Sequence, residues 1–109
     1  MKKAYLASPY SHPDPKVREE RFIEVCGLAA SLMWGDNDLT VFSPIAHSHP
    51  IAVHGGLSGS ADYWEKHNRA WLDWADVLFV ADMEGTKESE GIRREIEYAI
   101  NAKKRVVWL

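Results

Sequence analysis

The chain has 109 residues, of which 46% are hydrophobic, which is enough for one core and too little for two. Its formal net charge is −3 and its basic residues are scattered, so the composition excludes a surface built for long nucleic acid. No apolar run is long enough to cross a bilayer and no signal peptide pattern follows Met1, so we expect a single domain over residues 1–109, with no membrane partner, in the cytoplasm.

The first apolar run, residues 4–7, predicts a buried strand, and turn residues lead from it to a helix. This helix should begin at Pro15, a residue suited to a first helical position, and end near Trp34, before the turn residues 35–38. Cys26, the only cysteine, falls on its apolar stripe and is predicted to be a small core residue in a reducing compartment. The stripe comprises Phe22, Val25, Cys26, Ala29, Leu32 and Met33.

A second strand is predicted at residues 39–42, followed by a long loop at residues 43–60. The loop contains two prolines, three histidines and three glycines, and long loops in compact domains often cover a ligand. We therefore expect this loop, with His47, to close over a bound molecule. A zinc site formed by His47, His49, His54 and Asp62 is an alternative, but their spacing matches no standard ligand pattern, so neither a metal nor a cofactor is expected.

The second half of the chain alternates in the same way: a helix at residues 61–75, a strand at 77–81, a helix at 88–102 and a strand at 105–109. This alternation predicts an α/β fold, a flavodoxin-like three-layer sandwich with a parallel sheet of four to five strands. Three tryptophans at helical spacing are expected to pack on the sheet or on another subunit, which suggests a homodimer or homotetramer. They are Trp64, Trp71 and Trp74.

In such a sheet, ligands bind at the carboxyl ends of the strands where the strand order reverses. The expected ligand-binding residues there are Ser8, Pro9 and Tyr10 after the first strand, and the segment 82–89, beginning with Asp82, after the third. Ser89 and Gly91, near a helix start, can offer hydroxyl and backbone N–H donors to a phosphate.

Glu95 lies beside the inward face of the last helix and is predicted to be a half-buried carboxylate directed at that ligand. Placement alone allows other interpretations. Glu95 is also consistent with a solvated residue paired with a basic neighbour, Ser89 with a helix cap and Tyr5 with a core aromatic.

Two segments carry a resemblance to a known family. YLASPY (residues 5–10) and SEGIRREIEYA (residues 89–99) resemble the nucleoside 2-deoxyribosyltransferase family, including its branch that hydrolyses deoxynucleoside 5′-monophosphates. Nearly the whole chain, including SPYSHPD (residues 8–14) and FSPIAHSHP (residues 42–50), is similar to a subgroup of uncharacterised function, DUF1937.

The resemblance implies a role for each matching residue. It implies that Glu95 attacks the anomeric carbon to give a glycosyl-enzyme intermediate and that Tyr5 hydrogen-bonds this nucleophile. It also implies that Ser89 and Gly91 bind a 5′-phosphate. A carboxylate beside the reacting carbon suits this chemistry, because loss of the nucleobase builds positive charge on the sugar.

The sequence departs from the family at two places. Asn68 occupies the position of a family acid that contacts the sugar or protonates the base, and an amide cannot supply that proton. Asp73 or Asp82 could replace it, the base could leave without a protein acid, or activity could be weak or lost. The family also completes its pocket with a polar residue beyond the last strand, donated by a neighbouring subunit, which has no counterpart before Leu109.

These observations favour an N-glycosidase or 2-deoxyribosyltransferase acting on a small nucleoside or nucleoside 5′-monophosphate. Glu95, Tyr5 and the Asn68 position form its expected catalytic group. Two alternatives are a nucleotide-binding module without catalysis and an NAD nucleosidase.

Overall fold

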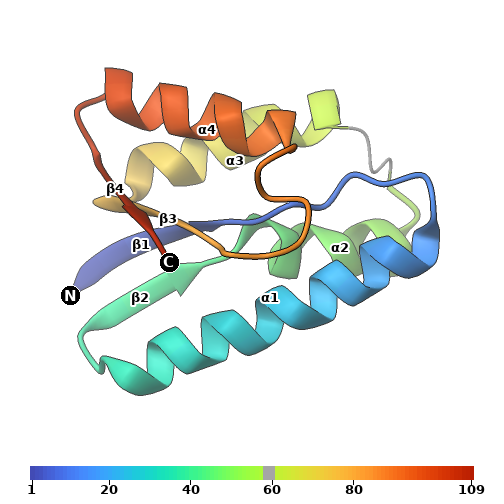
Figure 1. Ribbon diagram of the computed structural model, residues 1–109, viewed down its shortest axis with the longest axis horizontal. Coiled ribbons are helices and arrows are strands. Elements are labelled where there is room, and N and C mark those ends of the chain that lie inside the picture. The colour runs from blue at the N-terminus through green and yellow to red at the C-terminus, as the bar shows by residue number, and fades with distance from the viewer. Residues whose placement is uncertain (58–60) are drawn as a thin grey trace.

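The computed structural model describes residues 1–57 and 61–109, in which a parallel four-stranded sheet carries helices on both faces (Figure 1). This confirms the predicted three-layer α/β fold. The elements are β1 (Lys2–Ala7), α1 (Pro15–Gly35), β2 (Leu39–Phe42), α2 (Pro44–Gly55), α3 (Ala61–Trp74), β3 (Val77–Val80), α4 (Glu90–Asn101) and β4 (Arg105–Trp108). Among the described residues, no helix combines the length and the apolar character that a membrane span needs.

The strand order β2-β1-β3-β4 places β1 in the middle of the sheet. Tyr5 of β1 is in register with Phe42 of β2 on one side and with Leu78 of β3 on the other. The chain passes from β1 to β2 and then crosses to β3 on the opposite side of β1, so the order reverses between β1 and β3. Ligand sites of parallel sheets lie at this kind of position.

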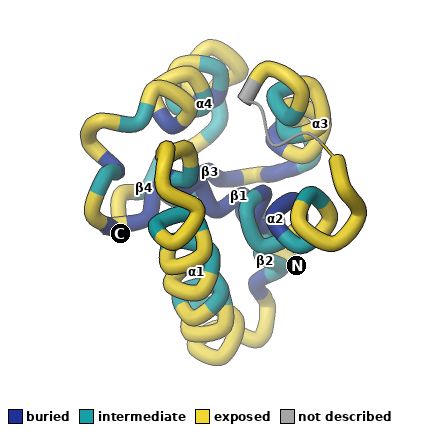
Figure 2. Tube along the Cα trace, turned by 90° about the vertical axis from the view of Figure 1, so that its right-hand side faces the viewer, coloured by how far each residue is buried: buried dark blue, intermediate teal, exposed yellow. Residues whose placement is uncertain are grey.

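Side chains alternate along β1 and so contribute to two cores. Tyr5 and Ala7 pack with residues of α3 and α4, whereas Leu6 packs with α1. Figure 2 shows the buried strands at the centre and the helices with their exposed sides outward. The two strands that border the reversal point, β1 and β3, therefore both contribute to the buried cores.

Helix α1 begins and ends as its sequence predicts. Asp14 caps it by accepting a hydrogen bond from the Lys16 backbone N–H at 2.9 Å, and a proline occupies the first turn. The predicted apolar stripe is only partly correct, because Met33 is 51% exposed and Cys26 is half-buried. At about 1.5 Å per residue the helix is roughly 31 Å long, against about 20 Å for β1, and Figure 1 shows its first turns beyond the carboxyl ends of the strands.

The predicted loop at residues 43–60 was wrong over most of its length, because Pro44–Gly55 forms helix α2. Ser43 caps this helix through the Ala46 N–H at 3.1 Å, Pro44 occupies the first turn, and Gly56 ends the helix with φ +70°. The residues that suggested a loop thus stand where helices accept them: proline at the start and glycine at the end. Residues 58–60 of the predicted loop lie outside the described residues.

The predicted tryptophan packing is seen at Trp71, which stacks on Phe42 at the end of β2 with ring centroids 4.2 Å apart. Trp74 meets the Trp71 ring edge-on at 5.8 Å. Trp71 therefore covers the end of β2, and Trp74 packs against the core cluster that includes Tyr5 and Leu78.

Candidate active site

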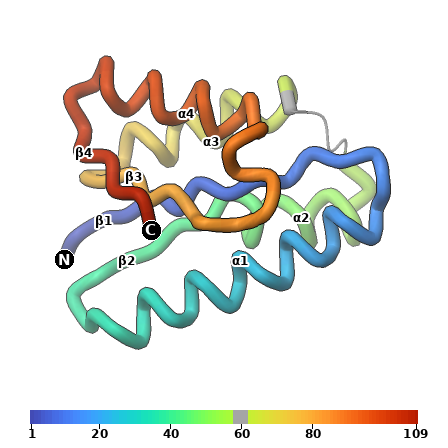
Figure 3. Tube along the Cα trace, viewed as in Figure 1, coloured from blue at the N-terminus to red at the C-terminus, as the bar shows by residue number. Residues whose placement is uncertain are grey.

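A cavity of about 500 Å³ lies where β1 and β3 end, bordered by α3 and the start of α4. Its volume is in the range of small-molecule sites. Figure 3 shows the segment after β1 and the loop after β3 running close together. A Cβ placed on Gly85 would lie 3.6 Å from the Cβ of Pro9, which confirms their proximity.

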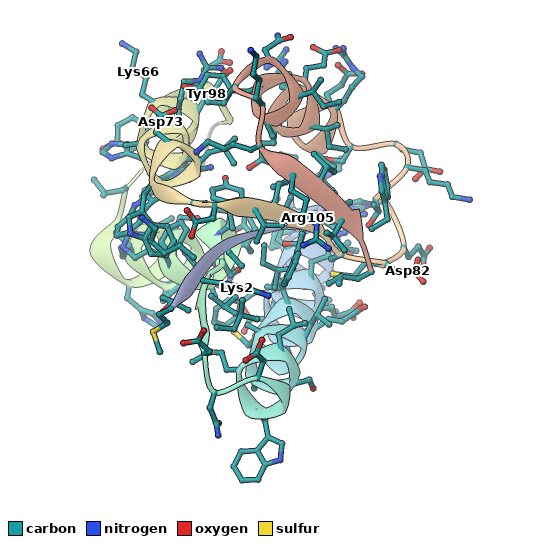
Figure 4. The ribbon with its side chains drawn as sticks, turned by 90° about the vertical axis from the view of Figure 1, so that its left-hand side faces the viewer. Lys2, Lys66, Asp73, Asp82, Tyr98 and Arg105 are labelled. Atoms are coloured by element: carbon teal, nitrogen blue, oxygen red, sulfur yellow. The ribbon has the colours of Figure 1, made fainter. Side chains whose placement is uncertain are left out.

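Most of the residues expected from the sequence line this cavity: Tyr5, Ser8, Pro9, Tyr10, Asn68, Ser89, Gly91 and Glu95. Two do not. His47 is exposed and lies beside the rings of Phe42 and Trp71, at 5.5 and 6.3 Å. Asp82 is exposed and lies in Figure 4 on the side of the sheet away from Asp73.

Tyr5 and Glu95 meet at the floor of the cavity. The Tyr5 hydroxyl donates a hydrogen bond to Oε2 of Glu95, and the tyrosine itself is fully buried in the central strand. Ile92 and Ala99 are buried on the inner face of α4, and Glu95 lies between them along the helix, half-buried. The carboxylate is therefore held from one side while its other oxygen is left for a ligand.

Burial controls the charge of this pair. It raises the pKa of Glu95 to about 7; the hydrogen bond from Tyr5 opposes this effect, and the charge of Glu65 adds to it. Burial and the neighbouring Glu95 also raise the pKa of Tyr5 well above its usual value, so Tyr5 remains a donor. Near neutral pH, Glu95 exists in both forms, and its ionised form is a poorly solvated base or nucleophile.

Polar donors gather at the start of α4. Ser89 caps the helix, its Oγ accepting from the Ile92 N–H at 3.2 Å, so its hydroxyl proton remains available to another acceptor. A Cβ on Gly91 would meet only Ser89 Oγ, at 3.8 Å, so the space above this backbone is open. Across the cavity, Ser8 is 6% exposed, and its Oγ has no hydrogen-bond partner among the described residues. These groups can bind the oxygens of an anion.

Arg21 is a lining residue that the sequence did not indicate. Its Nη1 donates to the Ser11 carbonyl at 3.0 Å, and a Cβ on Gly85 would lie 2.5 Å from its Nη2. Gly85 has φ +95°, which glycine alone adopts readily. Gly85 thus leaves room for the Arg21 guanidinium. No local sequence motif records this approach of α1 to the loop after β3, so the sequence could not identify Arg21 as a lining residue.

Asn68 lines the cavity, and the two aspartates considered in place of the family acid do not. The Asp73 carboxylate accepts a hydrogen bond from Tyr98 at an exposed position, and Figure 4 shows these two side chains together. Glu65, one turn before Asn68, is paired with Arg69 at 3.2 Å and Arg94 at 3.8 Å. Within the ranges 1–57 and 61–109, no three histidine, cysteine or acidic side chains are arranged to hold a metal ion.

Comparisons with known proteins place the fold. The family model described as "Domain of unknown function (DUF1937)" matches residues 2–109. The solved structure of a "2-desoxiribosyltransferase from Leishmania mexicana" matches with a TM-score of 0.61 and 18% sequence identity. The alignment covers 100% of this chain and 64% of that one, so this chain spans less than two thirds of that protein. No curated protein matches the chain.

Proposed function

The chain belongs to the DUF1937 family and has the fold of a 2-deoxyribosyltransferase. On this premise we propose that it is an N-glycosidase or 2-deoxyribosyltransferase, which cleaves the N-glycosidic bond of a small nucleoside or nucleoside 5′-monophosphate. The main support is the half-buried carboxylate of Glu95, held by Tyr5 at the floor of a cavity of nucleotide size.

In the proposed reaction, Glu95 attacks the anomeric carbon as the nucleobase leaves. The ionised carboxylate stabilises the positive charge that develops on the sugar and then bonds to it. Tyr5 keeps one carboxylate oxygen fixed, so that the other meets the sugar without reorganisation. Water or a second base then displaces Glu95 and restores it.

A 5′-monophosphate is the substrate that the start of α4 favours. The Ser89 hydroxyl and the first backbone N–H groups of the helix, which have no partner within it, would bind phosphate oxygens. Ser8 supplies a buried, unpartnered hydroxyl, and Arg21 supplies a positive charge in the same lining. Gly91 allows the phosphate to approach the backbone closely.

A second function, a nucleotide-binding module without catalysis, is favoured by one observation. Asn68 cannot protonate a leaving base, and neither Asp73 nor Asp82 lines the cavity. Such a module would bind a nucleotide and release no product.

We also propose a homo-oligomer, a dimer or a tetramer, for the protein in solution. Trp34 is 91% exposed and Trp108 is 62% exposed, and aromatic side chains are enriched in the contacts between protein subunits. Light scattering of the purified protein should give a mass at least twice that of the chain, and a monomer mass would refute this.

The test of function is a product assay with matched variants. The wild-type protein and Glu95→Gln are incubated with nucleosides, deoxynucleosides, their 5′-monophosphates and NAD, with and without an acceptor base, and the products are separated chromatographically. Glu97→Gln is the control, because Glu97 is exposed on the same helix and paired with Arg93 at 2.6 Å.

Free or exchanged base from the wild type and Glu97→Gln, but not from Glu95→Gln, supports the proposal and identifies the substrate. Full turnover by Glu95→Gln refutes the role of Glu95. Binding by calorimetry without any product favours the binding module.

A further inference from the structure

A buried histidine connects the cavity to the outer side of the molecule. His49 of α2 is 6% exposed, and its ring stacks on Phe22 of α1 with centroids 4.3 Å apart. Its Nδ1 lies 2.6 Å from the Tyr10 hydroxyl, and its Nε2 lies 2.6 Å from Oε2 of Glu19. Both ring nitrogens are therefore engaged in short hydrogen bonds.

The two partners of His49 stand in different surroundings. Tyr10 lines the cavity, whereas the Glu19 side chain is 53% exposed on α1. Burial raises the pKa of Tyr10; Arg18 opposes this effect and Glu19 adds to it. Three groups that each carry or accept a proton thus form a continuous path from the cavity, through a histidine shielded by an aromatic ring, to solvent.

The proposed reaction needs such a path because a departing base must gain a proton. Among the described lining residues, the carboxylates other than Glu95 are exposed or ion-paired. They are Asp62, Glu65, Glu88 and Glu90. Asn68 has no proton of suitable acidity, so the phenol of Tyr10 is the better donor.

We propose that Tyr10 is the catalytic acid and base of the site, that His49 passes a proton to and from Tyr10, and that Glu19 holds His49 in place. This inference rests on the proposed glycosidic-bond cleavage. It assigns to Tyr10 the role of proton donor, which the family resemblance would place at the position of Asn68.

The steps balance when His49 begins with both nitrogens protonated, Nδ1–H donating to Tyr10 and Nε2–H donating to Glu19. As the bond from C1′ to the base breaks and the bond from C1′ to Glu95 forms, Tyr10 gives its proton to a ring nitrogen of the base. Tyr10 takes the Nδ1 proton in return and leaves His49 neutral. When water bonds to C1′ and Glu95 leaves, a proton of that water goes to Tyr10, whose own proton returns to Nδ1.

The test uses two substrates that differ in their need for an acid: 2′-deoxyguanosine 5′-monophosphate and its N7-methylated form, whose base already carries a positive charge and leaves without a proton. Tyr10→Phe should slow cleavage of the first by about 100-fold or more, the usual effect of a general acid. It should slow cleavage of the methylated substrate only slightly. Glu19→Gln, at an exposed position, should show the same preference to a smaller degree.

His54→Gln is the control, because His54 is an exposed histidine at the end of the same helix, α2. Equal slowing of both substrates by Tyr10→Phe, or no slowing of either, overturns the proton relay. Loss of turnover in Glu95→Gln under those outcomes would leave the proposed function standing. Failure of the wild type to cleave these two substrates and every substrate of the product assay overturns both proposals.

Discussion

Replacing Glu95 with glutamine should abolish activity and also make the protein more stable at alkaline pH. Burial raises the pKa of Glu95 from 4.5 to about 7, so the folded state holds the neutral carboxyl better than the unfolded state does. Between these two values the folded state binds more protons, and its stability therefore falls as pH rises and becomes constant above pH 7. Glutamine keeps the shape and the acceptor for Tyr5 but has no charge to lose.

The interval between 4.5 and about 7 corresponds to roughly 3.5 kcal/mol at about 1.4 kcal/mol per pKa unit. Because Glu95 is half-buried rather than fully buried, solvent screening makes this an upper value. Urea denaturation at pH 8 should show Glu95→Gln more stable than the wild type by about 1–3 kcal/mol, and the difference should nearly vanish at about pH 4, below the unfolded-state pKa. Glu97→Gln should follow the wild type at both pH values. A lower stability of Glu95→Gln at pH 8, or a gain of equal size at both pH values, would refute the reasoning.

Three further substitutions test other parts of the site. Tyr5→Phe removes the hydrogen bond that lowers the pKa of Glu95, so this pKa should rise. In pH profiles of kcat/KM, the pH of half-maximal activity, expected near 7 for the wild type, should therefore be higher for Tyr5→Phe. Ser89→Ala should raise KM for a 5′-monophosphate about tenfold and leave KM for the nucleoside unchanged, as steady-state kinetics will check. It should also reduce stability by about 1 kcal/mol in urea denaturation, because the helix cap is lost. Ser89→Thr should restore both the KM for the monophosphate and the stability. Gly85→Ala places a Cβ 2.5 Å from a guanidinium nitrogen of Arg21 and gives alanine a φ of +95°. Urea denaturation should therefore show a loss of about 1–3 kcal/mol in the free energy of unfolding. Gly27→Ala, on the open surface of a helix, should not destabilise the protein.

The layered fold could be predicted because buried parallel strands are short apolar runs, and Val77–Val80 is such a run between two amphipathic helices. Helix α2 could not be predicted by counting its prolines and glycines, since the meaning of those residues depends on whether they stand inside a helix or at its ends. This error also explains the placement of His47. Residues two apart on a helix point in nearly opposite directions, so α2 directs His47 outward and buries His49.

The pairing of Tyr5 with Glu95 followed from the resemblance and from the inward face marked by Ile92 and Ala99, and the structure brings both side chains into one cavity. Arg21 and the Tyr10–His49–Glu19 path could not be predicted in this way. They depend on how α1 and α2 pack against the end of β1, and no local pattern in the sequence records that packing.

The hydrogen bond between Tyr5 and Glu95 joins residues 90 positions apart, and this separation ties the site to the order in which the chain is made. Synthesis delivers β1 well before α4, so a nascent chain carries only half of the pair while the segment between them is made. Contacts between distant segments and parallel strand pairing also form slowly, because a long loop must close before they stabilise the chain. The contact between Tyr5 and Glu95 should therefore form late in folding, and the cavity floor is complete only in a molecule that has finished folding.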